Sequence, residues 1–343
     1  MNINEQSILG RWKEFTLTND HGMSVSMLDF GGIITKICVP DREGNVENVV
    51  LGYKDYKHYE DNPNFFGALI GRVGGRIQDA SFEIDGIKYP LETNDGDNHL
   101  HGGSSGFHHV IWDAQSFQTD NTVGLMLTHT SLDGAGGYPG NVEVAVTYTL
   151  NNDNELILDY AAKTDKSTPL TMTNHSYFNL SGDLKDTVQH HNVTMNSSYF
   201  VELDHALIPT GRKLDVSNTT FDFRNGRMLQ DGFVTDSEQH LIADHGYDHY
   251  FIFDNEGKVV VYEENAGRRL TVRTEQPGMV MYTANGLADR LELAEGLSRK
   301  HLGVCFETQS SPASLHNDGF PSVMLKAEDT YNKRTIFSFD VEK

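Results

Sequence analysis

Five short stretches of this sequence carry acid, base and hydrogen-bonding side chains in settings that solubility alone does not require. They are GRVGGRIQ, NHLHGG, TNHSYFNL, GYDHYF and VCFETQ. In VCFETQ, Glu307 directly follows Val304, Cys305 and Phe306. A carboxylate among apolar neighbours loses hydration, so its pKa rises toward that of a working base. A salt-bridged structural carboxylate would leave the same pattern and is the alternative at this point.

Two further stretches offer groups that can exchange protons or bind hydroxyls. In TNHSYFNL, an extended backbone would place His175, Tyr177 and Asn179 on one wholly polar face. A solvent-exposed sheet face and hydrogen-bonded polar groups in the core are the alternatives there. In GYDHYF, Asp248 precedes an apolar run, where a turn carboxylate that bonds its own backbone would look the same.

Two arginines lie among glycines in GALIGRVGGRIQDA. Glycines let the backbone approach a ligand, and the guanidinium of Arg72 or Arg76 supplies a planar fork of donors. A phosphate-binding loop does not fit, because no Lys-Ser or Lys-Thr pair follows the glycines. A glycine-rich hairpin with exposed arginines is the alternative.

The stretch GDNHLHGGSSG places His99 and His101 two residues apart, so on a strand both would point to one side and could reach a zinc or iron ion. The sequence contains no HExxH and no CxxC, and we therefore expect no metal. Cys305 lies in apolar company, which disfavours its use as a nucleophile.

Composition narrows the partners and the compartment. The 343 residues include 27 Lys and Arg against 49 Asp and Glu, a formal net charge of -22 that repels nucleic acid and anionic membrane surfaces. We therefore expect no nucleic-acid and no membrane partner. The N-terminus shows no signal-peptide pattern, so the expected location is cytoplasmic. Cys38 and Cys305 are predicted to be buried reduced thiols, with one disulfide as the alternative.

The elements that must position these groups are mainly strands. In VEVAVTYTL, every second residue from Val142 is large and apolar, which is typical of a half-buried strand. ELILDYAAKT and TIFSFDVE follow the same period, and Gly, Asn, Asp and Pro clusters separate such runs. Helical periodicity is rare, and the best helix candidate spans residues 226–242. Without a linker or a repeat, the chain is predicted to be a single all-β domain over residues 1–343, a large antiparallel β-sandwich.

Several motifs together resemble one known family. They are, in chain order, GGRI, NHLHGG, DGAGGYPG, TNHSYFNL, FDFR, GYDHYF, TEQPG and FETQ. Their order and spacing are similar to those of the aldose 1-epimerases, also called galactose mutarotases. The resemblance implies a galactose mutarotase-like supersandwich and an isomerase that interconverts the α and β anomers of free aldoses, in hexose and galactose metabolism. It implies no cofactor, and a small aldose sugar as the partner.

The resemblance also implies roles for particular residues. Glu307 matches the general base and His175 the general acid, while the positions that hold the sugar match Arg76, His101, Tyr177, Asp248 and Gln276. Gly75 stands where many relatives carry Asn, so we expect a side-chain contact to the sugar to be missing there. We expect the glycines around His101 to let a sugar hydroxyl approach its imidazole, with Asn98 and His99 shaping the loop.

The chemistry of anomer exchange needs one acid and one base, which open the ring by moving a proton from the C1 hydroxyl and another to the ring oxygen. A His175 with an ordinary pKa near 6.5 would suit this task. The aromatic candidates for packing a sugar face are Trp112, Phe66 and Tyr177.

Two other functions remain open from the residues alone. A glycoside hydrolase would use Asp248 and Glu307 as its carboxylate pair, and a carbohydrate-binding module would bind sugar without any reaction. The preferred sugar, whether galactose, glucose, maltose or xylose, and the oligomeric state are not predicted. Hexose 6-phosphates are disfavoured by the acidic composition.

Overall fold

Three antiparallel sheets contain most of the strand residues in a computed structural model that describes residues 1–342. The five-stranded sheet consists of β1 (Asn2–Ile8), β2 (Trp12–Thr18), β3 (Ser24–Leu28), β4 (Ile34–Pro40) and β5 (Val46–Asn48). The nine-stranded sheet runs, in spatial order, through β11 (Asp113–Gln118), β12 (Thr122–Ser131), β13 (Val142–Asn151), β14 (Glu155–Thr164), β30 (Tyr331–Val341), β24 (Arg268–Thr274), β23 (Gly257–Tyr262), β18 (Asn192–Met195) and β21 (Arg227–Met228). The six-stranded sheet runs through β17 (Tyr177–Phe178), β28 (Val304–Gln309), β25 (Gly278–Tyr282), β22 (Asp248–Ile252), β19 (Tyr199–Leu203) and β20 (Pro209–Asp215).

Short strand pairs and turns connect and cap these sheets. The pairs are β6 (Leu69–Ile70) with β16 (Thr173–Asn174), β7 (Arg76–Ile77) with β10 (His99–Leu100), β8 (Ser81–Ile84) with β9 (Ile87–Pro90), β15 (Thr168–Pro169) with β29 (Met324–Leu325), and β26 (Glu292–Leu293) with β27 (Gly296–Leu297). The α-helices of the described residues are α1 (Gln230–Phe233) and α2 (Glu238–Ile242), and short 3-10 turns include Tyr56–Tyr59, Gly103–Ser105 and Pro312–Leu315.

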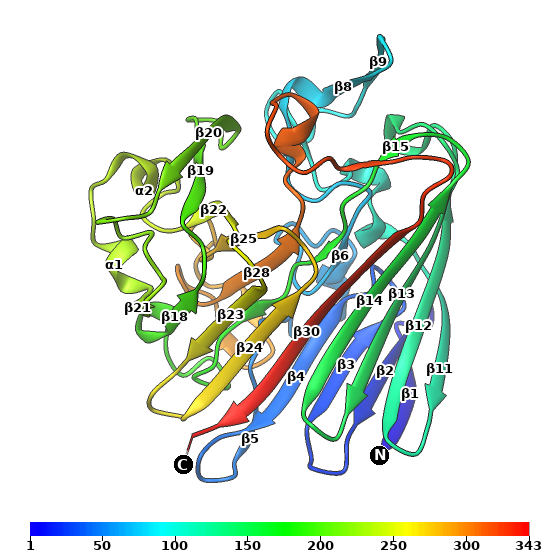
Figure 1. The fold of residues 1–343 in the computed structure, drawn as a ribbon. Helices are drawn as coiled ribbons and strands as arrows, with labels where there is room; N and C mark the ends of the chain where they lie inside the picture. Colours follow the sequence, from blue (N-terminus) through cyan, green and yellow to red (C-terminus); the bar gives the residue numbers. More distant parts are fainter. Residues whose placement is uncertain (343) are drawn as a thin grey trace.

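One continuous hydrophobic core lies between the sheets. Side chains from all three sheets meet in it, among them Phe15 of β2, Val146 of β13 and Phe306 of β28. Figure 1 shows β1 to β4 behind the long strands β12 to β14 and β30, with both ends of the chain at the same end of the molecule. The nine-stranded sheet is thus one layer, and the two smaller sheets pack against it.

The strand pattern read from the sequence is confirmed. VEVAVTYTL lies in β13, where Val142, Val144 and every second residue after them are buried. ELILDYAAKT forms β14 and TIFSFDVE lies in β30, which pair with each other in antiparallel register. The prediction of an all-β protein built from antiparallel sheets is therefore correct.

The single helix expected over 226–242 is wrong. Met228 lies in β21, and α1 and α2 are one-turn helices separated by extended or turn backbone at 234–237. Thr235, Asp236 and Ser237 interrupt the helix because their short polar side chains compete for backbone hydrogen bonds.

Both cysteines are free thiols, as predicted, although Cys38 is only partly buried while Cys305 is fully buried. Within residues 1–342, no helix is long and apolar enough to cross a membrane.

Candidate active site

The floor of the site is one face of the six-stranded sheet. Because side chains alternate along a strand, Val304 and Phe306 of β28 enter the main core while Cys305, Glu307 and Gln309 share the opposite face. All six residues of β28 are buried. Val304 and Phe306 therefore anchor the strand in the core, and Glu307 and Gln309 lie on the face that forms the floor of the site.

Strand register brings the polar face of β22 to the same floor. Val280 of β25 lies directly opposite Glu307, and Tyr282 of β25 lies opposite Asp248 of β22. Residues that oppose each other in a ladder point to the same side of the sheet, so Asp248 and Glu307 face one space. GYDHYF and VCFETQ, nearly sixty residues apart in sequence, thus supply two carboxyl groups to a single cavity.

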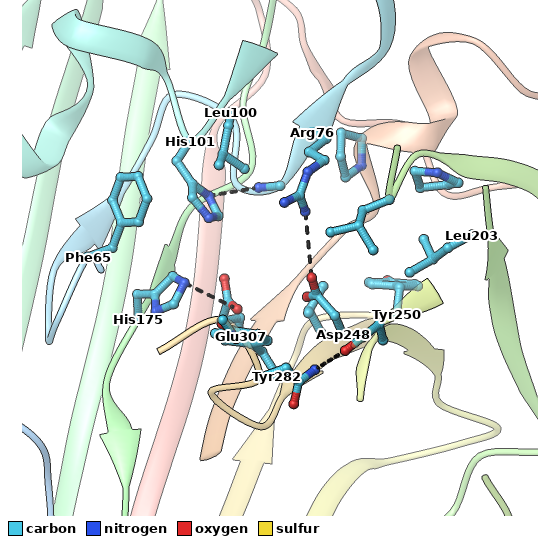
Figure 2. A pocket seen from close by; sticks show the side chains of 18 of the residues that line it. Phe65, Arg76, Leu100, His101, His175, Leu203, Asp248, Tyr250, Tyr282 and Glu307 are labelled. Atoms are coloured by element: carbon cyan, nitrogen blue, oxygen red, sulfur yellow. Dashed lines mark hydrogen bonds and ion pairs between the residues drawn. The ribbon is translucent and has the colours of Figure 1, made fainter. Parts of the chain in front are cut away.

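The cavity above this floor has a volume of about 380 Å³. Figure 2 shows the side chains that converge on it from the sheet, from β7, and from the loops around residues 65 and 101. Its size falls in the usual range for a small-molecule site. Its walls mix charged, hydroxyl and amide groups with apolar side chains, and the predicted site residues among them are Gly75, Arg76, His101, His175, Tyr177, Asp248 and Glu307.

Glu307 is the deepest carboxyl group of the cavity and is only 3% exposed. Burial raises its pKa well above the ordinary value, and the nearby carboxyl of Asp248 raises it further, whereas Arg76 acts in the opposite direction. Desolvation is therefore the main cause of the shift, as the apolar neighbours in the sequence predicted.

His175 faces Glu307 across a gap of 3.6 Å between Nε2 and Oε1, drawn as a dashed line in Figure 2. Its backbone is fixed on both sides, because its N–H donates to Ala68 O at 2.9 Å and its carbonyl accepts from Gly67 N at 3.1 Å. Burial lowers the pKa of His175 to about 4, so the expectation of an ordinary value was wrong.

The stretch TNHSYFNL is not one continuous strand. It pairs through β16 and β17 and breaks between them at His175 and Ser176, and none of its residues forms an exposed polar face. The Asn174 side-chain amide donates to Gly67 O, and the amide of Asn179 donates to Leu302 O. The interpretation as hydrogen-bonded core groups is therefore correct for the two asparagines, while His175 and Tyr177 line the cavity.

Arg76 bridges the cavity and its rim. Its Nε donates to Asp95 Oδ2 at 2.6 Å, and its Nη1 lies 3.7 Å from Asp248 Oδ2. Burial raises the pKa of Asp248, and the guanidinium partly opposes this effect. Arg72 has a different role, because it is buried and donates to the carbonyls of Ser131, Pro139 and others away from the cavity.

Two hydrogen bonds join His101 and Gly75, one to the His101 ring and one between their backbones. The Gly75 N–H donates to His101 Nδ1 at 3.1 Å, and the His101 N–H donates to Gly75 O at 3.2 Å. Because Nδ1 accepts, the neutral ring carries its proton on Nε2. Figure 2 shows this ring beside Leu100 at the upper wall of the cavity.

The glycines around His101 serve a different purpose from the one expected. A Cβ on Gly102 would lie 2.1 Å from Gly71 O, so the glycine allows two chain segments to pack closely, instead of opening space for a ligand. Asn98 accepts from the Asp79 N–H, and His99 Nδ1 contacts Glu92 O at 2.7 Å. These two residues hold the loop.

The ligand atoms of His101, His175 and Glu307 lie within 4.8 Å of one another, close enough to consider a metal ion. A metal on His101 Nε2 would require the ring proton to move to Nδ1, where it would oppose the Gly75 N–H. The donor set therefore does not fit a metal.

Three predicted contacts lie outside the cavity. Gln276 precedes β25, donates to the Tyr331 hydroxyl at 2.9 Å and lines a separate groove, so the structure does not bring it to the site. Trp112 and Phe66 are both buried in hydrophobic clusters. The resemblance assigned Gln276 to the sugar site from a local motif. In the strand ladder, the residue opposite Glu307 is Val280, four residues later.

The sequence interpretation missed other lining residues. Phe65 packs against the rings of His101 and His175, with centroid separations of 4.8 and 5.8 Å. Tyr250 and Tyr282 also line the cavity. Tyr250 had a detectable signal, because it lies two residues after Asp248 and so shares its face of the strand.

A buried carboxyl beside a buried imidazole, in a cavity on a β-sandwich, are the groups that an acid-base enzyme uses, and comparison with known proteins identifies the family. The family model Aldose 1-epimerase matches residues 13–338. A galactose mutarotase of Sus scrofa is 38% identical over 341 residues, covering 97% of this chain and 95% of that protein. A maltose epimerase of Levilactobacillus brevis is 32% identical over 328 residues, covering 95% and 93%.

Two solved structures of similar proteins have the same fold as this chain. A GalM/aldose epimerase homologue from C. elegans superposes with a TM-score of 0.87 at 27% identity, covering 100% of both chains. A galactose 1-epimerase from Lactobacillus acidophilus gives the same TM-score and identity, covering 100% of this chain and 99% of that one. The chain belongs to the aldose 1-epimerase family, an isomerase family that includes the galactose mutarotases.

Proposed function

We propose that this protein interconverts the α and β anomers of a free aldose, with Glu307 removing the proton of the C1 hydroxyl and His175 delivering a proton to the ring oxygen. The observation that carries this assignment is the buried pair itself, whose Nε2 and Oε1 atoms lie 3.6 Å apart in the cavity. At this separation the two groups can both reach one bound sugar, so that one accepts a proton from it while the other donates a proton to it.

The reaction needs no other group to complete it. Loss of the C1 hydroxyl proton and protonation of the ring oxygen break the C1–O5 bond and leave an open-chain aldehyde. Rotation about C1–C2 presents the other carbonyl face, and closure reverses both proton transfers, so Glu307 and His175 exchange roles in each turnover. Burial makes Glu307 a stronger base and protonated His175 a stronger acid, because it raises the pKa of the carboxyl and lowers that of the imidazole.

The remaining walls suit a neutral polyol, which presents both donors and acceptors. Arg76 and the Nε2–H of His101 donate to sugar oxygens, and Asp248 accepts from a hydroxyl. Tyr177 and Phe65 supply aromatic surface close to the acid-base pair.

The substrate class follows from the charges around the cavity. Among its described lining residues, Arg76 is the single arginine or lysine, and it already faces Asp95 and Asp248. A sugar phosphate would therefore lack a free cation, and we propose neutral sugars such as galactose and glucose, with maltose and xylose as further candidates. A cytoplasmic location, without nucleic-acid or membrane partners, belongs to the same proposal.

The test is to dissolve crystalline α-D-galactose and α-D-glucose separately in weak buffer and to follow optical rotation with and without the protein. Faster relaxation to the same final rotation is expected. Release of free sugar from a glycoside would instead indicate a hydrolase, and saturable sugar binding without acceleration would indicate a binding module. Either result would contradict the proposal.

A further inference from the structure

The two ring nitrogens of His175 face different partners. Nε2 faces Glu307 and the cavity, whereas Nδ1 lies 3.5 Å from the Sγ atom of Cys305. Within residues 1–342, this sulfur is the one side-chain hydrogen-bonding contact of Nδ1. His175 is 4% exposed and Cys305 is fully buried, so both partners of this contact are largely removed from bulk solvent.

The sheet fixes the sulfur in this place. Cys305 lies on β28 between register partners on both sides, with Tyr177 of β17 opposite it in one direction and Tyr282 of β25 in the other. It shares the polar face of β28 with Glu307, two residues along the strand. One strand therefore sets both the group in front of the imidazole and the group behind it.

Proton exchange through Nε2 places a demand on Nδ1. When Nε2 gives its proton to the sugar, the neutral ring must keep its remaining proton on Nδ1. A buried N–H without an acceptor is destabilised, because it has lost its bonds to water. The partner of the second nitrogen therefore sets which nitrogen is free to exchange protons.

We propose that the sulfur of Cys305 accepts the Nδ1–H of His175 and is thus a positioning residue for proton transfer through Nε2. The proposal rests on the role of His175 in the proposed function. Burial, together with the Glu307 and Asp248 carboxyls, raises the pKa of the Cys305 thiol well above its ordinary value. The group is therefore a neutral thiol and does not act as a nucleophile.

The direct test is the protonation pattern of the His175 ring, measured in the wild-type protein by long-range ¹H–¹⁵N NMR, with the His175→Asn spectrum used to assign the signals. We expect Nδ1 to carry a proton in the neutral ring as well as in the doubly protonated ring that delivers a proton from Nε2. A neutral ring protonated on Nε2 instead of Nδ1 would overturn the proposal. This readout does not depend on turnover, so it separates a failure of the proposal from a failure of the proposed function, which the wild-type optical rotation tests independently.

Kinetics of three variants provide a second test. Cys305→Ala removes the acceptor and is expected to lower kcat by about 10–100-fold with little change in KM. Cys305→Ser restores an acceptor and is expected to recover most of kcat. Cys38→Ala is the matched control, because Cys38 lies on β4 away from the cavity and its loss should leave kcat unchanged.

Outcomes of the kinetic test are equally definite. Unchanged kcat in Cys305→Ala, or a Cys305→Ser variant as impaired as the alanine variant while folded, would contradict the proposal. If Cys305→Ala does not fold, the wild-type ring pattern and the serine variant decide the question.

Discussion

At the scale of single residues, one physical cause acts on Glu307 and His175 in opposite directions. Burial disfavours charge, so it raises the pKa of the carboxyl and lowers that of the imidazole to about 4. The sequence predicted the first shift because the three residues before Glu307 are apolar. It did not predict the second, because Asn174 and Ser176 flank His175 and its burial comes from distant segments.

A pair of substitutions tests which residues hold the sugar. Asp248→Asn removes a charged acceptor from the cavity and the partner of Arg76, so KM is expected to rise at least about tenfold, with a smaller effect on kcat. Gln276→Ala is expected to leave KM unchanged because Gln276 bonds Tyr331 outside the cavity. Steady-state polarimetry measures both, and an equal rise in KM in the two variants would contradict this placement.

At the scale of elements, alternation along strands was predictable, and the pairing between strands was not. The alternation within VCFETQ and within GYDHYF shows which residues of each strand share a face. Only the register of both strands with β25 brings Asp248 and Glu307 to one cavity. That register depends on contacts between segments far apart in sequence, which a local pattern does not contain. Gln276 was misplaced for the same reason.

Loop packing around His101 provides a matched test with two glycines of nearly equal φ. Gly22→Ala (φ +86°) places a Cβ in open space and is expected to cost about 1–2 kcal/mol of unfolding free energy from backbone strain alone. Gly102→Ala (φ +85°) adds a clash with Gly71 O and displaces the neighbouring His101, so it should lose more stability and raise KM. Urea unfolding and polarimetry measure these effects, and equal destabilisation would refute the packing argument.

At the scale of the whole molecule, the alternation of apolar residues predicted an all-β sandwich but did not predict the order of its strands. The last strand, β30, inserts between β14 and β24 and so joins the two halves of the nine-stranded sheet. No local pattern encodes a pairing over that sequence separation. The assignment of residues 1–343 to one domain stays a prediction.

The buried histidines make stability depend on pH. Burial lowers the pKa of His191 to about 3, and its Nε2 accepts the Leu180 N–H at 2.8 Å, a contact that protonation destroys. Below about pH 6.5 the unfolded chain binds a proton at this residue and the folded protein does not, so stability falls as pH decreases toward 3. The loss approaches about 1.4 kcal/mol per pH unit.

His191→Gln removes this contribution and retains an acceptor for Leu180. Urea unfolding at several values between pH 7 and pH 4 should therefore show the wild type losing stability more steeply than the variant as the pH falls. Other titrating groups, Glu307 included, are common to both proteins and cancel in the comparison. Parallel curves would show that His191 does not contribute in this way.

The most direct test of the central claim is the rate of α-D-galactose mutarotation, followed by optical rotation, in Glu307→Gln and His175→Asn beside the wild type. Circular dichroism confirms that each variant is folded. The account predicts that each substitution lowers kcat by about 10²–10⁴-fold, since each removes one of the two proton-transfer groups. Near-wild-type activity in either folded variant would contradict the assignment of the acid-base pair.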